Sequence, residues 1–252
     1  MIFIFDLDGT ISFSGKEIAT VILSELKKIE KLGHQIVFAS ARPIRDMLPL
    51  IQVDFPNHFL IGGNGSIISN SGEIEIVRPL EKDALLHLKK LINNYDLDYL
   101  VDSEWDYALK NRNDRQANIN DKIDALQLAR NISLESICES IKCNLLNIPA
   151  NLYDEVIDFL KKLDVTIIIH SDNYSIDVVA KAINKYETFV KYFGSTSYIA
   201  FGNDNNDIEL LSNARHSISV GNNEKVKEIS DVNVEANDES VALFLRTFDI
   251  GK

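Results

Sequence analysis

The stretch Ile2-Phe3-Ile4-Phe5-Asp6-Leu7-Asp8-Gly9-Thr10 places two carboxylates directly after a continuous apolar run. Residues 2–5 are rich in β-formers, which is typical of a buried strand in a parallel sheet. Two carboxylates at the end of such a strand repel each other unless a hard divalent cation lies between them. Gly9 permits a sharp turn, and Thr10 can hydrogen-bond to it. An isolated Asp-x-Asp is more often a pair of solvated turn residues, so the rest of the chain must decide between the two interpretations.

Strand and helix patterns alternate at both ends of the chain. Residues 17–32 have helical apolar spacing, Gly33 follows as a stop signal, and residues 35–39 form a second apolar run. The C-terminal part repeats this order, with strands expected at 198–201, 217–220 and 232–234 and helices at 207–214, 224–229 and 239–248. Such alternation predicts an α/β fold with a doubly wound, Rossmann-like parallel sheet covered by helices on both faces.

The middle of the chain has a different pattern. The sequence predicts strands at 59–61, 66–69, 74–77, 166–170 and 174–179, helices at 80–93 and 153–163, and a further element of unassigned type at 145–149. Residues 111–129 are strongly polar and receive no firm prediction. We therefore expect a core domain formed by residues 1–79 and 176–252, with an α+β cap domain, residues 80–175, inserted between its two parts.

Composition excludes several classes of function. The 252 residues include 38 acidic and 26 basic side chains, a formal net charge of −12, which disfavours a nucleic-acid partner. The two cysteines, Cys138 and Cys143, form no zinc pattern and are expected to be reduced thiols. No signal peptide and no apolar run long enough to span a membrane is recognisable. We expect a cytoplasmic protein without membrane attachment, either a monomer or a homodimer.

Polar clusters follow three of the predicted strands. The first strand ends at Asp6, the second at Ser40-Ala41-Arg42, and the strand at 198–201 is followed by Asn203-Asp204-Asn205-Asn206-Asp207. Ligands bind at the carboxyl ends of strands in open α/β sheets, so we expect these clusters to meet at one edge. Their convergence favours a cation site over solvated turn residues. Mg²⁺ is the natural cation for an all-oxygen site that handles phosphate.

Four segments resemble, in order and spacing, the motifs of the haloacid dehalogenase-like (HAD) superfamily. Residues 6–10 resemble motif I, residues 40–42 the Ser/Thr-centred motif II, residues 180–185 the segment that carries the motif III lysine, and residues 201–208 motif IV. The inserted segment is similar to the type-two (IIB) cap of the Cof-like sugar-phosphatase branch. Asn64-Gly65-Ser66, which precedes a hairpin, also resembles that branch.

The resemblance implies a role for each matching residue. Asp6 would be the nucleophile that forms an aspartyl-phosphate, and Asp8 the general acid and base, with its carbonyl on the metal. The phosphoryl group would be bound by side chains or backbone groups of seven residues: Leu7, Ser40, Ala41, Arg42, Asn64, Lys185 and Asn206. For Ser40 a helix N-cap, and for Arg42 a solvated or cap-facing salt bridge, remain alternatives.

Two lysines compete for the motif III position. Lys181 and Lys185 both follow the strand predicted at 174–179. The resemblance favours Lys185, which lies at the start of a helix, and Lys181 is then expected to be a surface charge.

Motif IV departs from the family pattern at one position. The family usually has an aspartate directly after the motif IV glycine, where this chain has Asn203. An Asn carbonyl oxygen can coordinate Mg²⁺ but supplies no negative charge, so either Asn203 takes that position or a shifted loop uses Asp204. The candidate metal ligands are therefore Asp6, Asp8, Asn203, Asp204 and Asp207.

These observations imply a Mg²⁺-dependent phosphatase that acts on a small phosphorylated metabolite, with a sugar phosphate as the leading candidate by resemblance. A phosphomutase that passes the phosphoryl group to a second hydroxyl is one alternative. A ligand-binding or regulatory protein with a weakened site, which Asn203 suggests, is another. His170, expected at the cap end of a strand, is the histidine most relevant to the site.

Overall fold

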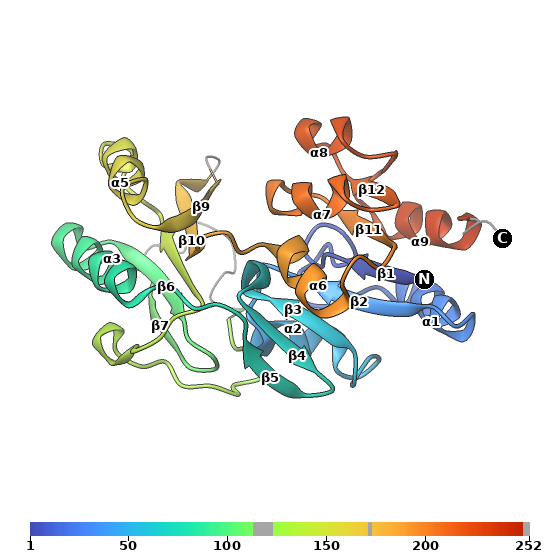
Figure 1. Ribbon diagram of the computed structural model, residues 1–252, viewed down its shortest axis with the longest axis horizontal. Helices are drawn as coiled ribbons and strands as arrows, with labels where there is room; N and C mark the ends of the chain where they lie inside the picture. Colours follow the sequence, from blue (N-terminus) through green and yellow to red (C-terminus); the bar gives the residue numbers. More distant parts are fainter. Residues whose placement is uncertain (113–122, 171–172, 249–252) are drawn as a thin grey trace.

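The computed structural model describes residues 1–112, 123–170 and 173–248, which form two β-sheets with helices packed against them (Figure 1). The larger sheet has eight strands in the order β13-β12-β11-β1-β2-β3-β4-β5, and the smaller has five in the order β7-β6-β8-β10-β9. The larger sheet contains β1 Ile2–Phe5, β2 Gln35–Ala39, β3 Phe59–Gly62, β4 Ile67–Asn70, β5 Glu73–Ile76, β11 Tyr198–Gly202, β12 His216–Val220 and β13 Val232–Val234. The smaller contains β6 Asp98–Asp102, β7 Tyr107–Lys110, β8 Lys142–Leu146, β9 Val165–His170 and β10 Ser175–Ala180.

Helices cover both faces of the larger sheet, as a doubly wound fold requires. Side chains alternate along β1, so that Phe3 and Phe5 join one apolar cluster while Ile2 and Ile4 join another. The first cluster packs against α1 Thr20–Lys31, α2 Ile44–Ile51 and α9 Asp238–Thr247. The second packs against α6 Lys185–Phe193, α7 Ile208–Ser212 and α8 Glu224–Glu228. The predicted fold class, with a parallel-sheet core and an α+β segment inserted in the chain, is confirmed.

The parallel part of the larger sheet has β1 at its centre. β1 pairs in parallel with β11 on one side and β2 on the other, and Phe5 lies between Phe201 and Phe38 in register. The rings of Phe5 and Phe201 stack at 4.5 Å between centroids. Because all four residues of β1 are buried, this strand needs apolar side chains on both faces. β4 and β5 extend the sheet as an antiparallel hairpin.

Helix α1 illustrates how closely the sequence signals match the structure. Its buried residues include Ile22, Leu26 and Ile29, which lie on one face at helical spacing. Gly33, at φ 86°, follows the helix in the left-handed conformation that glycine adopts without strain. The helix begins at Thr20, three residues later than predicted, because Ala19 is still extended at ψ 142°.

The smaller sheet has one face packed on helices and the other turned toward the larger sheet. Its apolar face includes Cys143, Leu145, Ile176 and Val178, which pack with α3 Lys82–Tyr95 and α5 Tyr153–Leu160. Strands β6 and β7 and helix α2 were not predicted from the sequence, and the element of unassigned type at 145–149 is a strand, β8, which begins three residues earlier. Most of the polar segment 111–129 lies outside the described residues.

The division into domains is a proposal that the two sheets support only in part. The boundary predicted between residues 175 and 176 falls at the start of β10, whose six residues pair with β9 and three of them with β8 in the smaller sheet. We therefore propose that the cap continues through Ala180. Within the described residues, no helix is both long and apolar enough to cross a membrane.

Candidate active site

The carboxyl ends of β1, β2 and β11 bring three polar clusters together. Since these strands are neighbours in parallel register, Asp6, Ser40 and Asn203 follow them at the same edge of the sheet. Asp6 and Ser40 are buried, with relative exposures of 5% and 1%. The sequence prediction that the clusters converge is therefore confirmed as a statement of position.

Lys185 lies between two buried carboxylates at this edge. Its Nζ is 2.7 Å from Asp6 Oδ1 and 2.7 Å from Asp207 Oδ1, and its side chain is fully buried. Lys185 is the first residue of α6, where Asn184 caps the helix by accepting a hydrogen bond from the Glu187 amide at 2.8 Å. The helix start thus fixes the lysine stem.

Lys181 occupies a different environment. Its side chain is 66% exposed and pairs with Asp164, which is 68% exposed, at 2.5 Å. Exposed pairs of this kind contribute little to stability. Of the two lysines that the sequence offered, only Lys185 contacts Asp6.

The buried charges at this edge of the sheet shift the pKa values of Asp6 and Lys185. Burial raises the pKa of the Asp6 carboxyl to about 7, although the charge of Lys185 lowers it. Burial alone would lower the pKa of Lys185, but Asp207 and Asp6 outweigh it and raise that pKa above its ordinary value. Lys185 is therefore a cation between two carboxyl groups. A second positive charge at Asp6 would favour its ionised form further.

Thr10 joins Asp6 to Asn203. Its hydroxyl lies 2.9 Å from Asp6 Oδ2 and 3.2 Å from Asn203 Oδ1, and one hydroxyl hydrogen serves both acceptors. Gly9 makes this approach possible, because a Cβ at that position would lie 2.3 Å from Asn203 Nδ2. Two oxygen atoms of the kind that Mg²⁺ prefers thus converge beside Asp8, whose backbone carbonyl is a third candidate ligand. Asp6, Asp8 and Asn203 fit a hard cation.

Asp207 and Asp204 are held by the loop itself. Asp207 Oδ1 contacts Lys185, and its Oδ2 accepts hydrogen bonds from the amides of Asn203 at 3.0 Å and Asp204 at 3.2 Å. Asp204 caps the short helical turn Asn205–Asp207. A Cβ at Gly202 would lie 2.6 Å from Asp207 Cβ, so the glycine makes room for this arrangement. Of the two residues left open by the sequence, the geometry favours Asn203 over Asp204 as a ligand. No cluster of three or more Asp, Glu, His or Cys side chains that could hold a metal occurs in the described ranges.

Asp8 forms a two-pronged ion pair with Arg42. Arg42 Nε and Nη2 lie 2.6 Å from the two carboxylate oxygens of Asp8. The same guanidinium donates to the carbonyls of Asp46 at 3.1 Å and Gly15 at 2.7 Å. Arg42 is only 11% exposed, whereas the Asp8 side chain is 42% exposed. Arg42 is thus neither solvated nor paired with the smaller sheet, and most of its donors already have partners in the larger one.

The other predicted phosphate-binding residues lie around these groups. Ser40 Oγ accepts a hydrogen bond from the Arg42 amide at 3.2 Å, and the Leu7 carbonyl accepts from the amides of the turn that follows it. Asn206 Nδ2 donates to Asn64 Oδ1 at 2.8 Å. Asn64 has φ 58°, and its Nδ2 lies 3.4 Å from Asp177 Oδ2 in the smaller sheet. The two asparagines therefore connect the motif IV loop to β10.

A cavity of about 310 Å³ lies between the two sheets, with Asp8 in its wall. The larger sheet and the loops and helix that follow its strands contribute Asp8, Ala41, Arg42, Pro43 and Asp46, and the segment between β7 and β8 contributes Ile123. The smaller sheet and its loops contribute Leu100, Lys142, Asn144, Leu146, His170, Asn173, Ser175 and Asp177. A small molecule in this cavity would touch both the Asp8 carboxylate and the polar face of the smaller sheet.

A family model described as haloacid dehalogenase-like hydrolase matches residues 3–245. The chain belongs to this family. The resemblance of the four motifs to the haloacid dehalogenase-like superfamily, and of the inserted segment to the type-two cap of its Cof-like branch, is confirmed.

Relatives of this hydrolase are similar along their whole length. The 5-amino-6-(5-phospho-D-ribitylamino)uracil phosphatase YitU of Bacillus subtilis (strain 168) is 22% identical over 264 residues, which cover 96% of this chain and 95% of that protein. The crystal structure of TM0651 from Thermotoga maritima has a TM-score of 0.80 at 20% identity and covers 99% of this chain and 98% of its own. The subclass IIB sugar phosphatase BT4131 has a TM-score of 0.80 at 20% identity, with 97% of each chain covered.

Of the residues of the hydrolase that line the cavity from the smaller sheet, sequence reasoning named His170 and missed the others. Lys142 Nζ donates to the Ala41 carbonyl at 2.9 Å and lies 3.8 Å from Asp177 Oδ2, and His170 Nε2 lies 3.6 Å from Asp177 Oδ1. The neighbouring Asp177 carboxylate raises the pKa of His170. The only signal for these residues was the alternation of polar and apolar side chains along β8 and β10.

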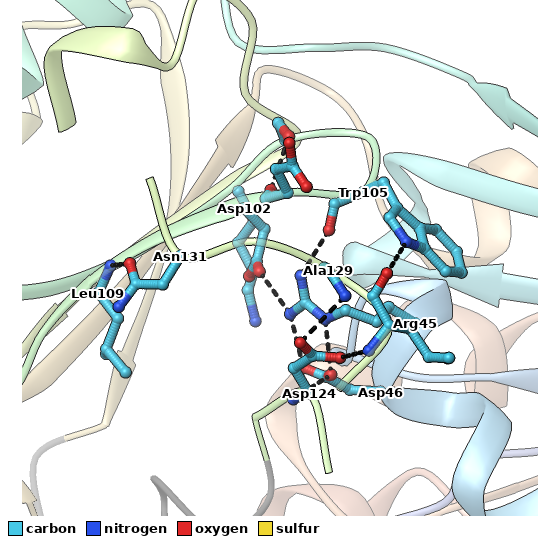
Figure 2. A network of polar contacts seen from close by, with 12 residues as sticks. Arg45, Asp46, Asp102, Trp105, Leu109, Asp124, Ala129 and Asn131 are labelled. Atoms are coloured by element: carbon cyan, nitrogen blue, oxygen red, sulfur yellow. Dashed lines mark hydrogen bonds and ion pairs between the residues drawn. The ribbon is translucent and has the colours of Figure 1, made fainter. Parts of the chain in front are cut away.

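A second buried ion-pair network lies beside the cavity and was also missed. Figure 2 shows the Arg45 guanidinium between Asp46, Asp102 and the backbone of Trp105. Arg45 is 1% exposed and contacts Asp46 Oδ1 at 2.8 Å, Asp102 Oδ1 at 3.0 Å and the Trp105 carbonyl at 2.7 Å. Since Arg45 lies in α2 and Asp102 ends β6, the network joins the two sheets. Removing one partner of a buried pair is costly, which makes this a fixed connection.

Proposed function

We propose that this haloacid dehalogenase-like hydrolase is a Mg²⁺-dependent phosphatase that hydrolyses a small phosphomonoester through an aspartyl-phosphate on Asp6. The observation that carries the proposal is the position of Asp6, held by Lys185 at 2.7 Å and by Thr10 at 2.9 Å beside the Asp8 carboxylate. A buried carboxylate beside a buried ammonium and a second carboxyl group is the arrangement that nucleophilic and acid–base phosphoryl chemistry needs.

The chain's own residues account for each bond in the reaction. A carboxylate oxygen of Asp6 attacks phosphorus, the bond from phosphorus to the ester oxygen breaks, and the leaving oxygen takes a proton from the Asp8 carboxyl. Asp8, now a carboxylate, takes a proton from water, which attacks phosphorus and frees Asp6. Lys185 and Ser40 stabilise the charge of the transferring group. Mg²⁺, held by Asp6, Asn203 and the Asp8 carbonyl, would supply further positive charge when bound.

The pair between Asp8 and Arg42 has a consequence for this reaction. A carboxyl that holds a proton accepts from a guanidinium less well than a carboxylate does, so Asp8 must loosen its contacts of 2.6 Å with Arg42 to act as an acid. We therefore assign Arg42 a positioning role toward Asp8 rather than direct phosphate binding.

Replacing Arg42 by Ala is expected to lower kcat about 10- to 100-fold, because Asp8 loses the group that orients it. The change should also alter the pH dependence of kcat, which a mere loss of packing would not do. Steady-state rates measured from pH 5 to pH 9, as an approximate range, test this. An unchanged pH profile together with a higher KM would instead indicate that Arg42 binds the substrate phosphate.

The residue Asn203 leads to a prediction about metal affinity. Asn203→Asp is expected to tighten Mg²⁺ binding by about tenfold, since a carboxylate replaces a neutral oxygen ligand near Asp6. Calorimetric titration of the wild type and the variant with MgCl₂ measures this directly. Asp204→Asn is the matched control and should change the affinity much less. Equal affinities of wild type and Asn203→Asp would remove Asn203 from the proposed ligand set.

The substrate is proposed from the size of the cavity and from the relatives. YitU is named for a ribityl phosphate compound, and BT4131 is described as a sugar phosphatase. A cavity of about 310 Å³ with mixed polar and apolar walls suits a sugar phosphate or a related small phosphate ester. A cytoplasmic location stays a prediction.

Hydrolysis of p-nitrophenyl phosphate with and without Mg²⁺ tests the proposed function. Metal-dependent turnover that disappears in Asp6→Asn is the expected result. Wild-type activity equal to that of Asp6→Asn would favour the alternative of a ligand-binding protein. Release of inorganic phosphate in a single turnover, without a second sugar, would exclude an obligatory phosphomutase.

A further inference from the structure

One face of the smaller sheet forms the wall of the cavity opposite Asp8. Lys142, Asn144 and Leu146 alternate along β8, and Ser175 and Asp177 alternate along β10, and all five line the cavity. Asn144 and Asp177 are directly opposite each other in the antiparallel pair of these strands. Their side chains therefore leave the sheet side by side, on the face away from α3 and α5.

Asp177 is buried but only loosely held. It is 5% exposed, and its oxygens lie 3.4 Å from Asn64 Nδ2, 3.6 Å from His170 Nε2 and 3.8 Å from Lys142 Nζ. All three distances exceed the range of about 2.7–3.2 Å for a good N–H···O hydrogen bond. Burial raises the pKa of this carboxyl, but Lys142 and His170 outweigh burial and hold it below the ordinary value. Asp177 is thus an ionised acceptor with capacity for closer donors.

Asn144 adds a second acceptor beside it. Its Oδ1 is buried and has no hydrogen-bond partner among the residues that the structure describes. A buried acceptor without a donor costs free energy, and a ligand that brings a donor recovers it once the Asn144 side chain, which lines the cavity, turns this oxygen toward the ligand. Two neighbouring acceptors that lack close donors call for a ligand with hydroxyl groups.

We propose that Asp177 and Asn144 are specificity-determining residues that accept hydrogen bonds from hydroxyl groups of the leaving group. This rests on the proposed phosphatase function and deepens it. The apolar side chains of Leu100 and Leu146 in the same wall suit the C–H groups of a polyol or sugar. A leaving group with a second phosphate or a carboxylate at this wall would face the Asp177 carboxylate. Lys142 does not offer a free binding partner to such an anion, because its ammonium already donates to the Ala41 carbonyl at 2.9 Å and lies beside Asp177.

The test compares two phosphate esters of equal carbon number, ribitol phosphate and pentyl phosphate. The measured quantity is the ratio of their kcat/KM values, because it cancels changes that affect the phosphoryl chemistry of both esters alike. The wild type is expected to favour ribitol phosphate by on the order of 10²-fold, since a site built to bind hydroxyls rejects analogues that lack them. Asp177→Asn should reduce the ratio by about tenfold or more, and Asn144→Ala by about fivefold.

Asp164→Asn is the matched control, because it makes the same chemical change at a carboxylate that is 68% exposed and pairs with Lys181 on the surface. Its ratio should equal that of the wild type. If Asp177→Asn fails to fold, the ratio of kcat/KM values measured for Asn144→Ala still tests the inference. A ratio that stays at the wild-type value in the folded variants, or rates that fall equally for both esters, would overturn the inference and leave the proposed function intact. A wild-type protein that releases phosphate from neither ester would overturn both.

Discussion

Replacing Asp6 by Asn is expected to lower kcat for any phosphate ester by on the order of 10⁴-fold or more, because the attacking oxygen is lost. The amide keeps the shape of the carboxyl but is a poor nucleophile, and it cannot form the aspartyl-phosphate. Steady-state release of inorganic phosphate at saturating Mg²⁺ is the measurement.

The expected loss of kcat in Asp6→Asn should reflect the lost nucleophile and not unfolding. Asp6 is buried, and Lys185 keeps a second carboxylate partner in Asp207 at 2.7 Å, so the variant should remain folded. Its thermal midpoint, followed by circular dichroism, is the control for that. Asp164→Asn makes the same change on the surface and should retain wild-type turnover. A Mg²⁺-dependent rate in Asp6→Asn within tenfold of the wild type, as an approximate limit, would remove Asp6 as the nucleophile.

Replacing Lys185 by Met is expected to lower kcat by about 10²- to 10³-fold, whereas Lys181→Met should have almost no effect. Both changes remove an ammonium and keep an apolar stem. They differ in position, because Lys185 contacts Asp6 and Asp207 while Lys181 pairs with Asp164 on the surface. Turnover measured side by side separates them. Loss of activity in Lys181→Met alone would show that the assignment of the motif III lysine is wrong.

The same variant should also lose stability. Without Lys185, two buried carboxyl groups lie close together with no cation between them, which costs about 3–5 kcal/mol of unfolding free energy. Burial already raises the pKa of Asp6, and Lys185 is the main group that lowers it, so the variant should raise that pKa further. A raised folded-state pKa gives stability that is lost as pH rises. Urea unfolding should therefore show a larger deficit at about pH 8 than at about pH 5. A deficit independent of pH would contradict this explanation.

The core was predictable because its signals are local. β1, β2 and β11 are buried on both faces, which demands continuous apolar runs, and the polar residues that follow them mark the ligand edge. Asp6, Lys185 and Asn203 were all named from the sequence and meet in the structure. Their catalytic and ligand roles remain proposals, since position alone does not establish them.

The smaller sheet was harder to predict for a physical reason. One face of β8 lines the cavity, so Lys142 and Asn144 interrupt its apolar pattern, and the sequence indicated only an element of unassigned type at 145–149. Helix α2 contains Pro49, which conceals its helical pattern. Apart from the Asp46 carboxylate, which directly follows Arg45, the partners of Arg42 and Arg45 come from distant parts of the chain or from backbone carbonyls, and no local sequence pattern encodes such contacts.

In the proposed reaction, Asp6 carries the phosphoryl group during turnover. Acid-quenching a single turnover at saturating Mg²⁺, followed by peptide mass spectrometry, tests it most directly. We expect a phosphoryl group on the peptide that contains Asp6, localised to that residue, which appears before inorganic phosphate and decays as phosphate is released. Release of phosphate at full rate with no labelled peptide, or with the label on Asp8, would contradict it.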